Sequence, residues 1–232
     1  MRIAVVTPYC RESVATLANC HNSVRAQRTA CTHVMVADGL PRSEVGSWDV
    51  EHVVLPRSHA DYGSTPRLIG SFHAVGLGFD GIAFLDADNW YRPDHLQILL
   101  ELHRRTGASF LSSSRLLCRL DGSVMGPCRT SDGEQFVDTS CMLLMRPAFG
   151  VLANWCLMPD YAQVISDRVF LYLAKAAGLT FAHSPEASVY YRCSKTGAYR
   201  RFGETPPEGV GPPPDYRTAF ERWVAEGNPP LE

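Results

Sequence analysis

The stretch Gly81-Ile82-Ala83-Phe84-Leu85-Asp86-Ala87-Asp88-Asn89 decides the fold that this sequence predicts. It begins with small and apolar residues, which favour a buried strand, and runs directly into two carboxylates one residue apart. Two aspartates at this spacing can reach the same divalent cation, directly or through a bound water. Pro93 then fits the first position of a helix that ends before Gly107. A buried strand, an acidic loop and a helix in this order indicate an α/β domain with its chemistry at the loop.

The sequence before this stretch alternates between strand and helix patterns. Strands are expected at 2–6, 33–37 and 50–55, and helices at 13–27, with Ser13 as N-cap, and at 66–75. This alternation predicts a central, mostly parallel sheet flanked by helices on both faces. Ligands bind such sheets beyond the carboxyl ends of the strands, where Thr7, Asp38 and the Asp86/Asp88 pair are expected.

The sequence after this stretch is less regular. Strands are expected at 109–120, 137–145 and 189–192, and a smaller second sheet region is expected beside the main one. A helix is expected from Asp167 to Ala177, with Ser166 as its N-cap. The proline clusters after Gly203 predict an extended or mobile tail.

Bulk properties exclude several classes of protein. A chain of 232 residues suffices for one well-buried α/β domain, and a net charge of −2 argues against a nucleic-acid partner. No stretch approaches the roughly 20 apolar residues of a transmembrane segment, and the N-terminus turns polar too early for a secretion signal. The eight cysteines show no C-x-x-C or zinc spacing, so we expect buried thiols in a reducing compartment. The expected location is the cytoplasm, with peripheral attachment to a membrane left open.

Five short motifs, in their order and spacing, resemble those of family 2 glycosyltransferases, which have the Rossmann-like GT-A fold. The motifs are Val5-Val6-Thr7-Pro8, Val36-Ala37-Asp38-Gly39, Phe84-Leu85-Asp86-Ala87-Asp88, Asp138-Thr139-Ser140-Cys141 and Ser166-Asp167-Arg168. The resemblance implies one catalytic domain over residues 1–195, in which 1–95 bind the nucleotide-sugar and 96–195 bind the acceptor. Residues 196–232 would then form a closing loop and a Pro-rich tail.

The resemblance also implies a nucleotide-sugar donor, usually a UDP-sugar, and a divalent metal, Mn²⁺ or Mg²⁺. Asp86 would face the ribose or the metal, and Asp88 would be the direct metal ligand. The remaining donor contacts that it implies are Thr7, Pro8 and Tyr9 in the nucleotide pocket, Asp38 on the base, Ala87 between the two aspartates, and Arg67. Around Arg67 the family's Asn-x-Gly and Arg-Asn signals are altered to Asp61-Tyr62-Gly63 and Pro66-Arg67-Leu68.

Asp167 matches the acidic residue that acts as general base in inverting members, although Ser166 replaces the glutamate that usually precedes it. Displacement at an anomeric carbon needs a group to take the proton of the attacking hydroxyl. A carboxylate at a helix N-terminus is kept ionised by the helix dipole and is ready to accept that proton. Asp167 is therefore the expected catalytic base.

Several points stay open at this stage. His183 could add a metal ligand, and Arg192, Arg200 and Arg201 could contact a diphosphate. A sugar-1-phosphate nucleotidyltransferase and an inactive nucleotide- or glycan-binding member of the same fold are the alternatives. A phosphatase-like D-x-D enzyme is disfavoured, because in that class the motif follows the first strand, whereas here it follows the fourth expected strand. The donor sugar, the oligomeric state and the acceptor, whether glycan, lipid-linked or small molecule, have no readable code.

Overall fold

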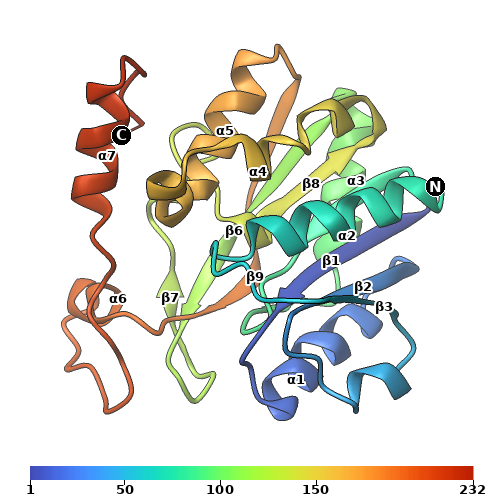
Figure 1. Ribbon diagram of the computed structural model, residues 1–232, viewed down its shortest axis with the longest axis horizontal. Helices are drawn as coiled ribbons and strands as arrows, with labels where there is room; N and C mark the ends of the chain where they lie inside the picture. The colour runs from blue at the N-terminus through green and yellow to red at the C-terminus, as the bar shows by residue number, and fades with distance from the viewer. Residues whose placement is uncertain (232) are drawn as a thin grey trace.

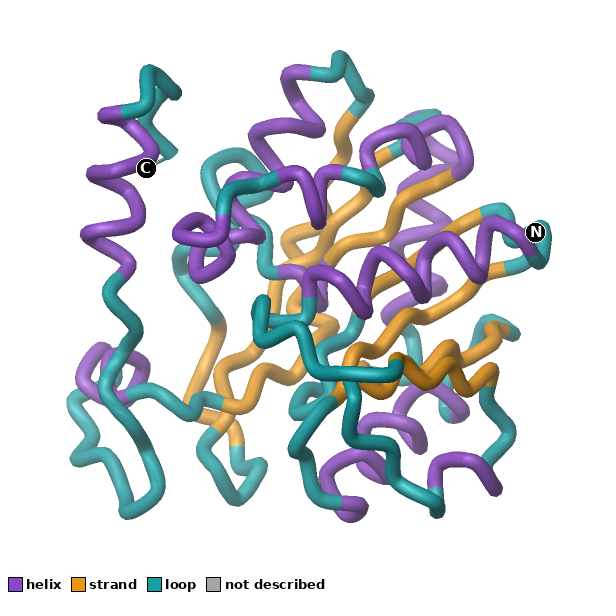
Figure 2. The backbone as a smooth tube through the Cα atoms, viewed as in Figure 1, coloured by secondary structure: helices purple, strands orange, loops and turns teal. Residues whose placement is uncertain are grey.

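The computed structural model describes residues 1–231 and is built around one nine-stranded sheet (Figures 1 and 2). The strands are β1 (Ile3–Tyr9), β2 (Cys31–Asp38), β3 (Glu51–Leu55), β4 (Gly81–Phe84), β5 (Trp90–Tyr91), β6 (Phe110–Cys118), β7 (Val124–Pro127), β8 (Met142–Met145) and β9 (Phe181–Arg192). Their order is β3-β2-β1-β4-β8-β6-β9-β5, and β7 pairs with β6.

Helices cover both faces of this sheet. They are α1 (Val14–Arg25), α2 (Ser64–Gly76), α3 (His95–Thr106), α4 (Asn154–Leu157), α5 (Ser166–Ala176), α6 (Thr196–Arg201) and α7 (Tyr216–Ala225). Figure 1 shows α2 and α4 in front of the sheet and α3 behind it. On the front face α2 packs closely over β1 and β2, because a side chain at Gly70 would overlap Val6 and Val36. The expected α/β architecture with helices on both faces is confirmed.

The N-terminal half of the sheet is parallel. β1 lies between β2 and β4, and β2 also pairs with β3, all in parallel register. Every residue of β1 is buried, as expected for a strand covered on both faces. Parallel pairing brings the carboxyl ends of β1, β2 and β4 to one edge, so Tyr9, Asp38 and the Asp86 loop meet there.

The C-terminal half of the sheet is mixed. β8 runs antiparallel to β4 and to β6, whereas β6 and β9 are parallel. The second sheet region that the sequence predicts is therefore continuous with the first. β8 joins the two halves, because it pairs with β4 on one side and with β6 on the other.

Two helix starts illustrate what the sequence predicts well and badly. Ser13 caps α1 as expected, and its hydroxyl accepts a hydrogen bond from the Thr16 amide at 3.2 Å. Ser166 does not cap α5, because a 3-10 turn over Asp160–Ile165 leads straight into the helix. Ser166 already has helical backbone angles, whereas an N-cap residue needs an extended backbone.

The segment after residue 195 is not the extended tail that its prolines predict. Figure 1 shows two helices there, α6 in orange and α7 in red. Ala219 and Trp223 of α7 are buried, and the Trp223 ring packs edge-on against Tyr172 of α5. Asp215 accepts a hydrogen bond from the Thr218 amide and so caps α7 directly after Pro212-Pro213-Pro214. The C-terminal segment therefore belongs to the folded body.

None of the helices formed by residues 1–231 combines the length and the apolar composition that crossing a membrane requires.

Candidate active site

The residues predicted to bind a nucleotide-sugar converge, with one exception, on a single open cavity. It lies at the carboxyl ends of β1, β2 and β4 and has a volume of about 660 Å³. We call it the D-x-D cavity. The predicted residues that line it are Pro8, Tyr9, Asp38, Arg67, Asp86, Ala87 and Asp88.

Thr7 is the exception, and here the structure differs from the sequence prediction. Its side chain is fully buried, and its hydroxyl lies 2.8 Å from Nε2 of His33 and 3.9 Å from Sγ of Cys20. Cys20 is a fully buried residue of α1. Thr7 therefore holds α1 and β2 against β1, while Pro8 and Tyr9 line the cavity.

Asp38 is engaged by the loop that follows β3. Its carboxylate accepts hydrogen bonds from the Ser58 hydroxyl at 3.1 Å and from the His59 amide at 3.0 Å, and His59 Nδ1 lies 2.6 Å from it. Burial opposes ionisation of Asp38, but these hydrogen bonds outweigh it and lower its pKa. Asp38 is thus an ionised anchor for this loop. A hydrogen bond from Asp38 to a nucleotide base stays a prediction.

The D-x-D loop is shaped by Ser140, a residue of the Asp138-Thr139-Ser140-Cys141 motif. The Ser140 hydroxyl accepts hydrogen bonds from the Asp86 amide at 3.2 Å and from Nδ2 of Asn89 at 2.9 Å. On the cavity side, Arg67 donates from Nη2 to Oδ1 of Asp86 at 2.8 Å. Ser140 thus holds the backbone of Asp86, and Arg67 orients its carboxylate.

Asp88 is the carboxylate with excess negative charge around it. Burial and the neighbouring carboxylates of Asp86 and Glu12 raise its pKa to about 7, against a weaker effect of Arg192. A divalent cation would remove this conflict, so the residues fit a metal. Within residues 1–231 no three histidine, cysteine or acidic side chains are arranged to enclose an ion. A cation here would therefore need oxygens from a ligand such as a diphosphate, which is typical of Mg²⁺ sites.

Asp167 lines a second cavity, of about 470 Å³, which we call the Asp167 cavity. The two cavities are adjacent, because Tyr62, Arg67, Asp86 and Tyr191 line both. Burial and the nearby Asp138 carboxylate raise the pKa of Asp167 to about 6. Asp167 is therefore able to hold a proton near neutral pH, as a general base must.

A buried ion pair forms the floor of the Asp167 cavity. Arg115 of β6 donates from Nη1 to Oδ2 of Asp138, and both residues are buried. The Arg115 guanidinium also lies over the Tyr191 ring, 4.1 Å from its centre, and over the Phe136 ring at 5.1 Å. The pair thus fixes Tyr191 at the junction of the two cavities.

The loop between β3 and α2 has an unusual backbone. Ala60 and Tyr62 have φ angles of +53° and +56°, in the left-handed region that side chains other than glycine rarely adopt. Gly39 allows this loop to pass close to the end of β2, since a side chain at Gly39 would overlap the Ser58 amide. Backbone strain of this kind gathers at functional sites, and Tyr62 lines both cavities.

The sequence leaves open whether His183, Arg192, Arg200 and Arg201 contact a metal or a diphosphate, and the structure places them differently. His183 lines neither cavity, because its ring is hydrogen-bonded to Ser112 at 2.9 Å and lies 3.3 Å from the Ser114 hydroxyl. Arg192 lies over the Trp90 ring, 5.3 Å from its centre, close enough to Asp88 to lower its pKa. Arg201 lines the Asp167 cavity, and Arg200 is exposed outside both cavities.

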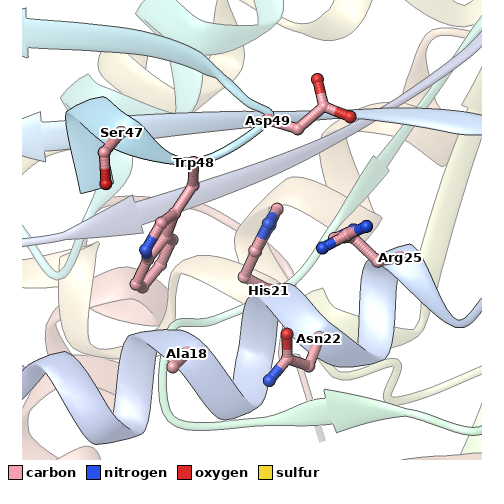
Figure 3. A pocket seen from close by; sticks show the side chains of 7 residues that line it. All are labelled: Ala18, His21, Asn22, Arg25, Ser47, Trp48 and Asp49. Carbon is pink, nitrogen blue, oxygen red and sulfur yellow. The ribbon is translucent and has the colours of Figure 1, made fainter. Parts of the chain in front are cut away.

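A third cavity, of about 320 Å³, lies between α1 and the turn Val45–Ser47 (Figure 3). His21 and Trp48 stack there with their ring centres 5.1 Å apart, and Figure 3 shows Arg25 and Asp49 on one side of this stack. This cavity shares no residue with the other two and contains none of the predicted site residues. The site chemistry therefore belongs to the D-x-D and Asp167 cavities.

Sequence reasoning missed several residues of the site. Glu12 faces Asp88, Arg115 pairs with Asp138, and Tyr62 and Tyr216 line the Asp167 cavity. Tyr216 belongs to the segment that was expected to be a tail. The altered Asp61-Tyr62-Gly63 motif was the one local signal that pointed to any of them.

Solved structures with this fold exist for TarS of S. aureus, a glycosyltransferase. The TarS structure matches with a TM-score of 0.65 and 15% identity, over 86% of this chain and 38% of that one. TarS 1–349 in complex with UDP matches with a TM-score of 0.62 and 14% identity, over 86% of this chain and 63% of that one. Its complex with UDP-GlcNAc matches with a TM-score of 0.56 and 12% identity, over 83% of this chain and 58% of that one. The chain spans less than two thirds of each of these structures. No protein-family model and no curated protein matches it. At these identities the similarity establishes the fold alone, which is the fold seen in the TarS structures.

Proposed function

We propose that the chain is a metal-dependent, inverting glycosyltransferase of the family 2, GT-A type. It would move a sugar from a nucleoside diphosphate, most simply UDP, to an acceptor hydroxyl. The observation that supports this best is the adjacency of the two cavities. One contains the Asp86/Asp88 pair, the other contains Asp167, and they share Arg67, Tyr62 and Tyr191.

The D-x-D cavity suits the donor. Asp86 and Asp88 would hold Mn²⁺ or Mg²⁺ together with the diphosphate oxygens, and this cation would stabilise the negative charge of the leaving group. Arg67 has two buried nitrogens, Nε and Nη1, without a hydrogen-bond partner within residues 1–231, and a phosphate would satisfy them. UDP and UDP-GlcNAc are bound in structures of TarS, so they are the first ligands to test here.

Asp167 suits the acceptor side. Its carboxylate would take the proton of the acceptor hydroxyl while the hydroxyl oxygen forms a bond to the anomeric carbon and the bond to the diphosphate breaks. Asp86 is paired with Arg67 and Asp88 is assigned to the metal, so neither is free for this role. Attack from the side opposite the leaving group inverts the anomeric configuration.

Calorimetry with UDP, in the presence of Mn²⁺ and again with chelator, tests the donor assignment. Binding is expected with Mn²⁺, and it should be lost with chelator and in Asp88→Asn. The exposed Asp160→Asn is the matched control, since Asp160 lines neither cavity. Equal binding in every condition would contradict the metal site.

The alternatives give different reactions. An inactive member of the fold would bind UDP but would not release it from UDP-glucose or UDP-GlcNAc. A nucleotidyltransferase would instead form pyrophosphate from UTP and a sugar-1-phosphate. Measuring UDP and pyrophosphate release with these substrates separates the three functions.

A further inference from the structure

The Asp167 cavity has a wall that the five sequence motifs do not include. Five aromatic rings line the cavity, and none of them belongs to those motifs: Tyr62, Phe136, Tyr191, Tyr216 and Phe220. Tyr216 and Phe220 belong to α7, which packs on the rest of the protein through the buried Trp223. The C-terminal helix thus closes one side of the cavity.

Two of these rings face solvent. Tyr62 is 63% exposed and Tyr216 is 41% exposed, and Phe72 is the one other exposed phenylalanine, tyrosine or tryptophan within residues 1–231. They do not stack on each other, but they are close enough that Tyr62 and Asp167 raise the pKa of Tyr216, in addition to the larger effect of burial. Tyr62 also has a backbone in the strained left-handed region. Two exposed rings at the opening of one cavity leave apolar surface for a ligand to cover.

The polar groups in the cavity complement these rings. Asp138 is neutralised by Arg115, whereas Asp167 lies without a salt bridge within residues 1–231, and Arg201 is exposed at the rim. Arg115 Nε is buried and has no hydrogen-bond partner among those residues. A ligand here meets ring faces and also hydrogen-bond donors and acceptors.

From this combination we propose that Tyr62 and Tyr216 form an aromatic clamp that binds a pyranose ring of a carbohydrate acceptor, with one of its hydroxyls directed to Asp167. The inference rests on the proposed function, and it narrows the acceptor to a cyclic sugar. A pyranose has an apolar C–H face that covers an aromatic ring and hydroxyls at its edge that need polar partners. A lipid chain would leave Nε of Arg115 and the carboxylate of Asp167 without partners, and an acyclic polyol has no flat face for the tyrosines.

Saturation-transfer NMR tests the clamp with cellobiose, lactose and mannobiose as probes and with acyclic sorbitol as the control ligand. The protein is the full chain with UDP and Mn²⁺ present. At least one disaccharide is expected to bind while sorbitol does not. Tyr62→Ala and Tyr216→Ala should each weaken that binding about tenfold, whereas Tyr62→Phe and Tyr216→Phe should retain it. Val224→Ala is the matched control on α7, because Val224 is exposed and lies outside this cavity.

Calorimetry of UDP on the same samples separates the two proposals. If UDP binds but no disaccharide does, or if the alanine variants bind the sugar normally, or if sorbitol binds equally well, the clamp is overturned and the donor assignment stands. If a disaccharide binds through the tyrosines but UDP does not bind, the clamp stands and the proposed function fails.

Discussion

Arg67 and Asp86 form an ion pair, 2.8 Å from Nη2 to Oδ1, at the boundary between the D-x-D cavity and the Asp167 cavity. Arg67 is 3% exposed, and its guanidinium lies over the Trp155 ring, 4.6 Å from its centre. This buried cation has one carboxylate partner and two nitrogens that lack a partner among residues 1–231, so it can bind a second anion. The pair therefore links the orientation of Asp86 to the binding of the diphosphate.

Replacing this arginine should weaken donor binding more than it disturbs the fold. Arg67→Lys keeps a charge but loses the planar fork, and Arg67→Met keeps the bulk without the charge. Hydrogen bonds to charged groups contribute about 1.5–3 kcal/mol, so UDP affinity with Mn²⁺ should fall roughly tenfold or more in both. Calorimetry measures this, with the exposed Arg25→Met as control. Unchanged affinity in Arg67→Met would show that Arg67 serves packing alone.

The elements that the sequence predicts correctly are those set by local patterns. The apolar run before Asp86 becomes β4, Ser13 caps α1, and Pro8, Tyr9, Asp38 and Asp86 meet at one sheet edge, since parallel strands end together.

What the sequence could not supply depends on contacts between distant residues. Thr7 lies next to Pro8 in β1, but its side chain contacts His33 in the interior and does not line the cavity. Arg115 and Asp138 are separated by 23 residues, and no local pattern marks them as partners. The prolines up to Pro214 obscure α7 in the sequence. The helix begins only after them, at the Asp215 cap, and it buries Ala219 and Trp223.

Breaking the Arg115–Asp138 pair from one side should destabilise the protein strongly. Arg115→Met leaves the Asp138 carboxylate buried without its partner, and removing one member of a buried pair costs about 3–5 kcal/mol. The double variant Arg115→Met/Asp138→Asn removes both charges and should recover most of that loss. Urea unfolding of the two variants measures the difference. Equal stability of the single and double variants would mean that the pair is screened by solvent.

The packing of α7 predicts a stability effect far from the D-x-D loop. Trp223→Ala removes a ring that is 4% exposed and packs against Tyr172, and such truncations cost about 3 kcal/mol or more. For a chain of this length that corresponds to a fall in Tm of roughly 6–12 °C. Val224→Ala on the same helix, 45% exposed, should change Tm by less than about 2 °C. An equally small change for Trp223→Ala would mean that the C-terminal segment is detached in solution.

Asp167→Asn should separate a catalytic role from a structural one, because the two roles predict opposite changes in stability. Burial raises the pKa of Asp167 to about 6, above its ordinary value of 3.8, so the folded protein favours the protonated carboxyl. The stability contributed by that proton is present in full below pH 3.8 and is lost as pH rises through about 6. Asp167→Asn cannot ionise, and at pH 8 it should therefore be more stable than the parent protein, by about 1–2 kcal/mol for this half-buried group.

The turnover of Asp167→Asn should fall, although its stability at pH 8 should rise. With Asp167 as base, kcat/KM of the parent protein falls about tenfold per pH unit below pH 6, and kcat of Asp167→Asn at pH 8 falls about 100-fold or more. UDP affinity should stay within a few-fold, because Asp167 does not line the D-x-D cavity. Urea unfolding at pH 4 and pH 8, together with the pH profile of UDP release, gives both readouts on the same two proteins. A variant that loses activity and also loses stability at pH 8 would identify Asp167 as a structural residue, since a carboxylate that supports the fold cannot be removed with a gain in stability.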